Sequence, residues 1–333
     1  MLTAHLAGGV VAGMMTSILL HPLDVLKVRL QVDSSSTALA RGGILLKTAM
    51  MLWKEEGIRG FYRGAIPGLL GSGSSWGLYF LFYEGCKLRL QNDGISTKRS
   101  KLSTEVDDNS NKTSHPSPKI TLTTAQHMYA AWEAGSITCI FTNPLWLIKT
   151  RMQLQKDNGI VRQGGSTAIH AKEVPYHGLL DAFRSIVRDE GIGGLYRGII
   201  PALLLTSHGM VQFGVYEALK QRFPTSGSDG VGFGGGSADQ ALRFFLFGAV
   251  SKAVATSATY PYQVIKSRLQ QRLVNGAPLY EGFFNCVQLI AKNEGLGGFY
   301  KGFVANLLRV APQSAITLLI YETVKNFVND KLN

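Results

Sequence analysis

Long apolar stretches alternate with short charged ones along most of this chain. Three of them, residues 1–23, 64–83 and 198–216, contain no Asp, Glu, Lys or Arg. Each is long enough to cross the ~30 Å hydrocarbon core of a membrane as a helix. Three further stretches carry one interior charge each: 120–148 with Glu133, 244–265 with Lys252, and 302–321 with Arg309. The pattern therefore predicts an all-α membrane protein with six transmembrane helices.

One ten-residue pattern, with Pro followed by Lys, Arg and Gln at fixed spacing, occurs three times. We call the copies the proline stretches: PLDVLKVRLQ (22–31), PLWLIKTRMQ (144–153) and PYQVIKSRLQ (261–270). Each is followed by an acid-Gly pair and an aromatic-basic-Gly triplet, in EEGIRGFYRG (55–64), DEGIGGLYRG (189–198) and NEGLGGFYKG (293–302). Each unit closes with Tyr-Glu-x-x-Lys, at 83–87, 216–220 and 321–325. Such self-similarity predicts three copies of one structural unit.

Each unit is expected to consist of a helix, a basic connector with a short amphipathic helix, and a second helix. Each proline is expected to kink the first helix near its end. The three repeats span 1–90, 120–222 and 239–333. Between them, the polar segment 91–119 and the Gly- and Ser-rich segment 223–238 have the composition of linkers. With six spans, both termini and both linkers lie on one side of the membrane.

Composition supports the membrane and excludes several other classes. Apolar residues make up 45% and charged residues only 17%, which is little charge for a soluble protein. The net charge of +12 fits positive loops or an anionic ligand, and no nucleic-acid motif accompanies it. Cys86, Cys139 and Cys286 form no disulfide or metal pattern. The run GSGSS at 71–75 lacks the Gly-Lys-Ser/Thr of a phosphate loop. We therefore expect no enzyme activity, metal or cofactor.

These threefold motifs resemble those of the mitochondrial carrier family, over nearly the whole chain outside the linkers. The resemblance implies six tilted helices in pseudo-threefold symmetry around one substrate site, with the short amphipathic helices on the matrix side. It also implies a monomer in the mitochondrial inner membrane, both termini facing the intermembrane space, with cardiolipin among its lipid contacts. A matrix gate and a cytosolic gate would open alternately.

The resemblance places the matrix gate in the proline stretches. Acid and Lys stand three residues apart there and so share one helix face. The expected pairs between neighbouring repeats are Asp24 with Lys149, Trp146 with Lys266, and Gln263 with Lys27. Only the first is a full ion pair, because Gln263 accepts a neutral hydrogen bond and Trp146 offers a ring face worth ~0.5–2 kcal/mol. We therefore expect a weak matrix gate whose excess positive charge attracts anions. The alternative is that Trp146 only fills a gap between helices.

The cytosolic gate is expected to be a complete ring of opposite charges. It is made by the acids and lysines of the three Tyr-Glu-x-x-Lys motifs: Glu84, Glu217 and Glu322 with Lys87, Lys220 and Lys325. An ion-pair ring that forms on one side while another breaks is a two-state element, and substrate binding can shift it.

Charges inside the spans are the first candidates for substrate contact, because an unpaired one is costly in a membrane. Arg309 stands at the family's contact position on the sixth helix, where its guanidinium can bind a carboxylate or phosphate bidentately. Helical spacing puts Lys252 in line with Gln263 and Lys266. Glu133 falls off the face of Trp146, so a helix-interface role or a pairing with Lys252 competes with substrate contact.

The remaining predicted substrate contacts are small, polar or aromatic. On the second helix they are Gly71, Ser74, Ser75 and Trp76; on the fourth they are Leu205, Thr206, Ser207 and His208. Trp146 and Lys266 of the matrix gate complete the set. Small residues would admit a flat ring and Trp76 would stack on it, with close helix packing as the alternative.

Within the family, Trp at the position of Trp146 resembles the branch that carries folate, flavin, NAD and pyrimidine nucleotides. Gln at the position of Gln263 looks most like the folate and flavin members. The resemblance therefore implies a transporter of FAD or folate, a small anionic heteroaromatic substrate. An NAD or pyrimidine nucleotide carrier is the alternative, as is a non-transporting membrane scaffold, against which the intact cytosolic ring argues. Exchange and net import stay equally open.

Overall fold

The computed structural model describes residues 2–33, 42–105, 123–155, 175–223, 238–273 and 277–332. These residues form helices and short turns, and no strand occurs among them. The helices are α1 (Leu2–Val32), α2 (Gly42–Phe61), α3 (Ala65–Glu105), α4 (Thr124–Leu154), α5 (Leu179–Gly194), α6 (Ile199–Leu205), α7 (His208–Arg222), α8 (Ala238–Leu269), α9 (Phe283–Gly298) and α10 (Phe303–Leu332). The expected all-α class is confirmed in this part of the chain.

The chain divides into two compact units, and each is described by itself. The first unit comprises residues 1–73, 142–205 and 258–333. It therefore contains all three proline stretches and the three short helices α2, α5 and α9. The second unit comprises residues 74–141 and 206–257. It holds α7, most of α3, and the first parts of α4 and α8.

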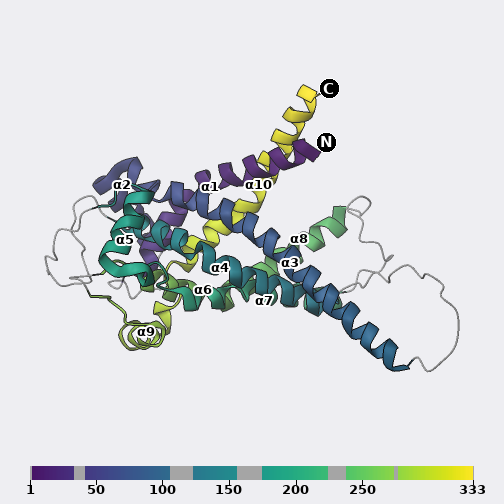
Figure 1. The fold of residues 1–333 in the computed structure, drawn as a ribbon. Coiled ribbons are helices and arrows are strands. Elements are labelled where there is room, and N and C mark those ends of the chain that lie inside the picture. The colour runs from purple at the N-terminus through teal and green to yellow at the C-terminus, as the bar shows by residue number, and fades with distance from the viewer. Residues whose placement is uncertain are drawn as a thin grey trace. The chain divides into compact units, whose positions relative to one another are not determined.

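In the first unit, each short helix packs on the helix that carries the preceding proline stretch. Apolar residues three or four positions after each proline pack against the buried face of the short helix, as expected for neighbouring positions on one helical face. The clusters are Val25 and Leu26 with Leu52, Leu147 and Ile148 with Ala182 and Ile186, and Ile265 with Cys286 and Ile290. The amphipathic helices expected from the repeats are thus α2, α5 and α9. Helix α1 also packs along α10 (Figure 1).

The three prolines lie inside helices rather than near their ends. Helices α1, α4 and α8 continue beyond them for more than two turns. The side chain before each proline reaches a backbone carbonyl near the start of the next long helix: His21 Nε2 lies 3.0 Å from Arg63 O, Asn143 donates to Leu195 O at 2.8 Å, and Tyr260 donates to Lys301 O at 3.0 Å. These bonds satisfy carbonyls that end a turn, where no helical donor follows.

A glycine with left-handed backbone stands before α3, α6 and α10. Gly302 has φ 78°, and a Cβ there would lie 2.9 Å from the carbonyl oxygen of Lys27. Its counterparts Gly64 and Gly198 have φ of 75° and 77° and face the carbonyls of Lys149 and Lys266. Only glycine adopts this conformation without strain and permits so close an approach.

In the second unit, α3 packs on α4 through Cys86, Ala130 and Ala134. Two polar contacts join the same helices: Arg89 Nη2 lies 2.5 Å from Glu133 Oε2, and Tyr83 Oη lies 3.0 Å from His127 Nδ1. Large apolar side chains on α3 are exposed, among them Trp76 at 64% and Phe80 at 58%. An exposed apolar row of this kind is unusual for a soluble monomer and is typical of a surface that contacts lipid or a partner.

Two organisational predictions remain untested. Helix α3 continues to Glu105, into the segment expected as the first linker, and residues 106–122 and 224–237 lie outside the described chain. Among the described residues, Ile199–Arg222 is the one helical stretch that is long and apolar enough to pass as a membrane span. One such stretch is weak support, so the six-span count stays a prediction.

Candidate functional site

The proline stretches of α1, α4 and α8 come together with α10 in the first unit. We call the polar group formed there the Asp24 cluster. Its members are Asp24 and Lys27 from α1, Trp146 and Lys149 from α4, Gln263 from α8, and Arg309 from α10. All six side chains are partly exposed rather than buried. Each repeat contributes, so the cluster joins all three repeats.

Asp24 holds two cations from two different repeats. Lys149 Nζ lies 3.1 Å from Asp24 Oδ2, and Arg309 Nε lies 3.2 Å from Asp24 Oδ1. The side chains of these residues are 15% (Lys149), 25% (Arg309) and 21% (Asp24) exposed. The Asp24–Lys149 pair expected from the repeats is therefore present. The pair with Arg309 was not expected, because nothing in either motif indicates that α1 and α10 bring these residues together.

The expected link between Lys27 and Gln263 is also present. Lys27 Nζ donates to Gln263 Oε1 at 2.8 Å. The same ammonium group lies 5.9 Å from the centre of the Tyr260 ring, within the range of a cation-π contact. The third and first repeats are therefore joined here by a hydrogen bond with a charged donor and a neutral acceptor.

Trp146 presents its ring to a lysine of its own helix. Lys149 Nζ lies 5.1 Å from the ring centre, whereas the expected cation was Lys266. Lys266 is half-buried on α8, and its contact with Trp146 stays a prediction. The ring also faces Gly71 on α3, where a Cβ would lie 3.6 Å from it. Trp146 thus fills space beside a small residue as well as facing a charge, and both of its proposed roles keep support.

Each repeat also contains a charge group around a buried glutamate, and we call these three groups the interlocks. Each joins the Arg of a proline stretch, the Glu of the acid-Gly pair and the basic residue of the aromatic-basic-Gly triplet. The members are Arg29, Glu56 and Arg63; Arg151, Glu190 and Arg197; and Arg268, Glu294 and Lys301. The three glutamate side chains are no more than 5% exposed.

The geometry of the third interlock shows how such a charge is held. Arg268 donates to both oxygens of Glu294, at 2.6 and 2.7 Å, and Lys301 Nζ lies 2.8 Å from Oε2. Burial by itself raises the pKa of Glu294, but the hydrogen bonds and charges of Arg268 and Lys301 outweigh it. The pKa therefore lies below its ordinary value, and the carboxylate stays ionised.

The same arginines also reach from one repeat to the next. Their Nε atoms donate to a backbone carbonyl near the end of the neighbouring helix: Arg29 to Gln153 O at 3.1 Å, Arg151 to Gln270 O at 3.2 Å, and Arg268 to Gln31 O at 3.0 Å. A cation is favourable at a helix C-terminus because the last carbonyls lack helical donors. The interlocks thus pair charges within a repeat, and between repeats their cations donate to uncharged backbone carbonyls.

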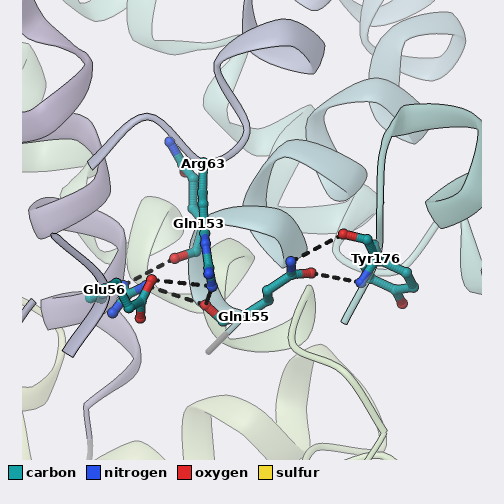
Figure 2. Close-up of polar contacts among 6 residues, drawn as sticks. Glu56, Arg63, Gln153, Gln155 and Tyr176 are labelled. Atoms are coloured by element: carbon teal, nitrogen blue, oxygen red, sulfur yellow. Dashed lines mark hydrogen bonds and ion pairs between the residues drawn. The ribbon is translucent and has the colours of Figure 1, made fainter. Parts of the chain in front are cut away.

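Figure 2 shows the first of these junctions in close-up. Arg63 donates to Gln155 O at 2.7 Å, and the Gln155 side chain makes two hydrogen bonds with the backbone of Tyr176, at 3.0 and 3.1 Å. Gln155 therefore ties the end of α4 to the segment that leads into α5. The interlock residues recur at fixed spacing, so the sequence alone marks them as motifs. Which of them pair with each other can be seen only in the structure.

The other predicted substrate residues fall largely in the second unit. Ser74, Ser75 and Trp76 follow Gly71 on α3, and Thr206 and Ser207 form the turn between α6 and α7. Leu205 ends α6 and His208 begins α7, so the fourth long helix is interrupted where contact was expected. Lys252 is half-buried on α8. Glu133 pairs with Arg89 of α3, which favours its helix-interface role.

Trp76 differs from the other predicted contacts in its exposure. It stacks on Phe80, with ring centres 5.8 Å apart and planes at 26°, and both rings belong to the exposed apolar row of α3. Of the predicted cytosolic charges, Glu84 and Lys87 pair along α3 at 3.1 Å. Glu217 and Lys220 lie on α7, and the side chains of Glu322 and Lys325 are outside the described residues. A ring across them stays a prediction.

Comparison with known proteins decides the family. The family profile described as "Mitochondrial carrier protein" matches residues 1–94, 121–227 and 237–332, which is most of the chain in three segments. The chain belongs to the mitochondrial carrier family. The expected resemblance is confirmed, and this carrier shares the family's three repeats. Its relatives are transporters, not enzymes.

Three named relatives show what proteins of similar sequence transport. The carrier is 39% identical over 326 residues to "Folate transporter 1, chloroplastic" of Arabidopsis thaliana, covering 95% of this chain and 92% of the relative. It is 32% identical over 332 residues to "Nicotinamide adenine dinucleotide transporter 2, mitochondrial" of the same plant, covering 97% and 79%. It is 30% identical over 331 residues to "Mitochondrial FAD carrier protein FLX1" of Saccharomyces cerevisiae, covering 98% and 97%.

Proposed function

We propose that this carrier transports folate or FAD across the mitochondrial inner membrane, by alternate opening of a matrix gate and a cytosolic gate. The observation that carries the proposal is the charge of the Asp24 cluster. The cluster holds one carboxylate, Asp24, which pairs with Lys149 and Arg309, and a third cation, Lys27, which donates to Gln263. The excess positive charge favours an anion, and folate and FAD are anions with flat heteroaromatic rings.

The proposed contacts divide between charge and shape. Arg309 is partly exposed, and the Nη atoms of its guanidinium can bind a carboxylate or a phosphate bidentately. Trp146 beside Gly71 offers an aromatic face next to a small residue, which suits a flat ring. Gln263 in place of an acid keeps the cluster positive. Lys252 and the residues from Leu205 to His208 remain proposed contacts.

The gate mechanism follows from the physics of exchangeable ion pairs. The links of the Asp24 cluster between repeats are one pair to Lys149, one to Arg309, and one hydrogen bond between Lys27 and Gln263. Because these side chains are partly exposed, each link contributes modestly and can be broken and re-formed. We propose the matrix gate here and the cytosolic gate at the Tyr-Glu-x-x-Lys charges.

Uptake into liposomes by the purified protein tests the substrate. Labelled folate, FAD, FMN, NAD and a pyrimidine nucleotide are compared, with Arg309→Ala as the site variant and Arg188→Ala on α5, whose side chain is 77% exposed, as its control. We expect uptake of folate or FAD to exceed uptake of the other compounds. It should fall about tenfold or more in Arg309→Ala and stay unchanged in Arg188→Ala. Uptake of none of the five would favour a scaffold and overturn the proposal.

NAD is the second candidate substrate, because an NAD transporter is among the relatives. Preference for NAD in the same assay would replace the folate and FAD proposal while keeping the carrier mechanism. Which membrane contains the carrier is a separate question, because the name of the folate relative describes it as chloroplastic. Cell fractionation with markers of both organelles distinguishes a mitochondrial from a chloroplast membrane.

A further inference from the structure

The three short helices α2, α5 and α9 have similar inward faces and different outward faces. We call the residues ten, six and three positions before each interlock glutamate the outer row. Their spacing of four and three residues places them on one side of the helix. The outer rows are Leu46, Met50 and Trp53 in α2; Leu180, Arg184 and Val187 in α5; and Phe284, Gln288 and Ala291 in α9. Of these three rows, only that of α2 consists entirely of apolar residues.

The outer row of α2 faces away from its repeat. Leu46, Met50 and Trp53 are 57%, 51% and 62% exposed. The Trp53 ring lies beside that of Phe61, with ring centres 6.3 Å apart, and Phe61 packs on the buried core between α1 and α2. Trp53 is therefore supported on one side while most of it is exposed. A continuous exposed apolar row of this kind marks a surface that contacts lipid or a partner.

Two lysines run beside the outer row of α2. Lys47 and Lys54 are exposed, and each follows a residue of the row, so it stands about 100° further around the helix. The equivalent positions hold Asp181 and Arg188 in α5, and Asn285 and Lys292 in α9. An apolar row with a basic row beside it is typical of a helix that lies in a membrane interface, where the basic side chains attract anionic lipids. Of the three short helices, α2 alone has both features.

Exposed apolar residues at equivalent positions of the repeats identify lipid as what covers this row. The residue after the glycine of each acid-Gly pair is apolar and 63–84% exposed: Ile58, Ile192 and Leu296. A single partner protein covers one face of a molecule, whereas a bilayer surrounds a membrane protein and reaches the equivalent surface of every repeat. Lipid therefore accounts for the exposed apolar positions that the repeats share, and the outer row of α2 extends the same surface.

We propose that α2 anchors the first repeat in the headgroup region of the bilayer and binds anionic lipid more strongly than α5 or α9. The outer row of α2 inserts among the acyl chains, and Lys47 and Lys54 bind the lipid phosphates. This inference goes beyond the proposed function and does not depend on the substrate. Because Leu52 and Glu56 attach α2 to α1, the anchor acts on the helix that carries Asp24.

The first experiment measures how deep α2 lies in the bilayer. The chain has four tryptophans, and Trp76, Trp132 and Trp146 are replaced by Phe so that only Trp53 remains. The protein is then placed in liposomes whose lipids carry bromine at different depths. Fluorescence of Trp53 should be quenched most by bromine roughly 5–10 Å below the headgroups, the depth to which an interfacial helix buries its apolar face.

Two variants test whether the composition of the outer row decides this depth. Met50→Gln gives α2 the residue that α9 has at this position, and it should lower the quenching because a polar amide then interrupts the apolar row. Ala291→Trp, made in protein whose Trp53 is also replaced by Phe, moves the reporter to α9 and should be quenched less. Equal quenching of the two reporters, or no effect of Met50→Gln, would overturn the anchor.

The second experiment keeps all four tryptophans and tests the charge. Thermal unfolding in detergent is followed while phosphatidylglycerol is added, because a lipid that binds the folded protein raises Tm. Lys47→Gln and Lys54→Gln should each raise the lipid concentration at half of the Tm increase by about fivefold, the contribution of one lysine near an anionic surface. Lys292→Gln on α9 is the matched control for Lys54→Gln and should have a smaller effect.

Two further additions distinguish anionic lipid from other ligands. Phosphatidylcholine, which has no net charge, and inorganic phosphate should each act alike on the wild type and on both α2 variants. A difference between Lys54→Gln and the wild type in inorganic phosphate would indicate a site for soluble anions and overturn the lipid proposal. Equal shifts from Lys292→Gln and Lys54→Gln in phosphatidylglycerol would overturn it too. These measurements use no transported substrate, so their outcome is independent of the uptake assay.

Discussion

Two sets of charged residues in the first unit, the interlocks and the Asp24 cluster, differ in composition and in exposure to solvent. The interlocks have nearly the same composition in every repeat, and their glutamates are 2–5% exposed. The Asp24 cluster has a different residue at the same position of each proline stretch, namely Asp24, Trp146 and Gln263. Its ion-paired side chains are 15–25% exposed.

This contrast indicates which bonds can change during transport. Breaking a buried pair leaves an uncompensated charge and is strongly unfavourable, so the interlocks hold each short helix to its own repeat. The partly exposed pairs of the Asp24 cluster join different repeats and cost little to exchange. The alternating access that we propose requires repeats that stay rigid while some of the charged links between them exchange.

Removing an interlock carboxylate should have the largest effect. Glu190 is 5% exposed and is bound by Arg151 and Arg197, so Glu190→Gln leaves Arg151 buried with a neutral partner. We expect a loss of about 3–5 kcal/mol in the free energy of unfolding, measured by denaturant unfolding in detergent. Asp189→Asn, one residue earlier and 56% exposed, is the control and should stay within about 0.5 kcal/mol. Equal losses would remove the distinction between the two sets.

A methyl group at Gly302 should have the next largest effect. Gly302→Ala forces a left-handed backbone on a residue with a Cβ, which costs ~1–2 kcal/mol, and places that Cβ 2.9 Å from Lys27 O. We expect a loss of about 2–3 kcal/mol in the same unfolding measurement.

Gly71→Ala is the matched control on the side of the Asp24 cluster. A Cβ at Gly71 would meet Trp146 at 3.6 Å and Leu145 at 3.7 Å, which are ordinary contacts. The expected change is within about 0.5 kcal/mol. A loss at Gly71 as large as that at Gly302 would show that Trp146 is packed as rigidly as the interlocks.

Restoring an acid in the Asp24 cluster should act on transport more than on stability. Trp146→Asp places a carboxylate near Lys149 and, by the expected pairing, Lys266. A stronger matrix gate should slow uptake by a few-fold, about the effect of one partly exposed ion pair. If Trp146 only plugs the gap beside Gly71, unfolding will instead show a loss of several kcal/mol, as for a lost core aromatic, before any change in rate.

The sequence predicted what recurs and what lies within one motif. Repeat spacing indicated the three short helices. Helical periodicity put Asp24 and Lys27 on one face and so predicted their contacts with Lys149 and Gln263, which the structure contains. It did not indicate that Arg309 binds Asp24, because that contact depends on how α10 packs on α1. The interlock residues were visible as motifs, yet a motif does not say which partner neutralises a charge. The sequence also gave no sign that the side chain of Trp76, a predicted substrate contact, would be largely exposed.

The smallest expected effect is the change in unfolding free energy when the pH is lowered, because it depends on the ionisation of one interlock residue, Glu294. The lowered pKa of Glu294 means that its stabilising contribution is fully present above the ordinary glutamate pKa of ~4.3 and is lost as pH falls from there through the lowered value. Between pH 6 and pH 4 the wild type should therefore lose no more than about 1 kcal/mol through this residue. Glu294→Gln lacks that contribution, so its unfolding free energy, though lower at pH 6, should fall less over the same interval. Because all other carboxylates are shared, the difference in slope isolates Glu294. Parallel slopes would mean that Arg268 and Lys301 do not favour its ionised form, and the third interlock would then be no more specialised than an exposed pair.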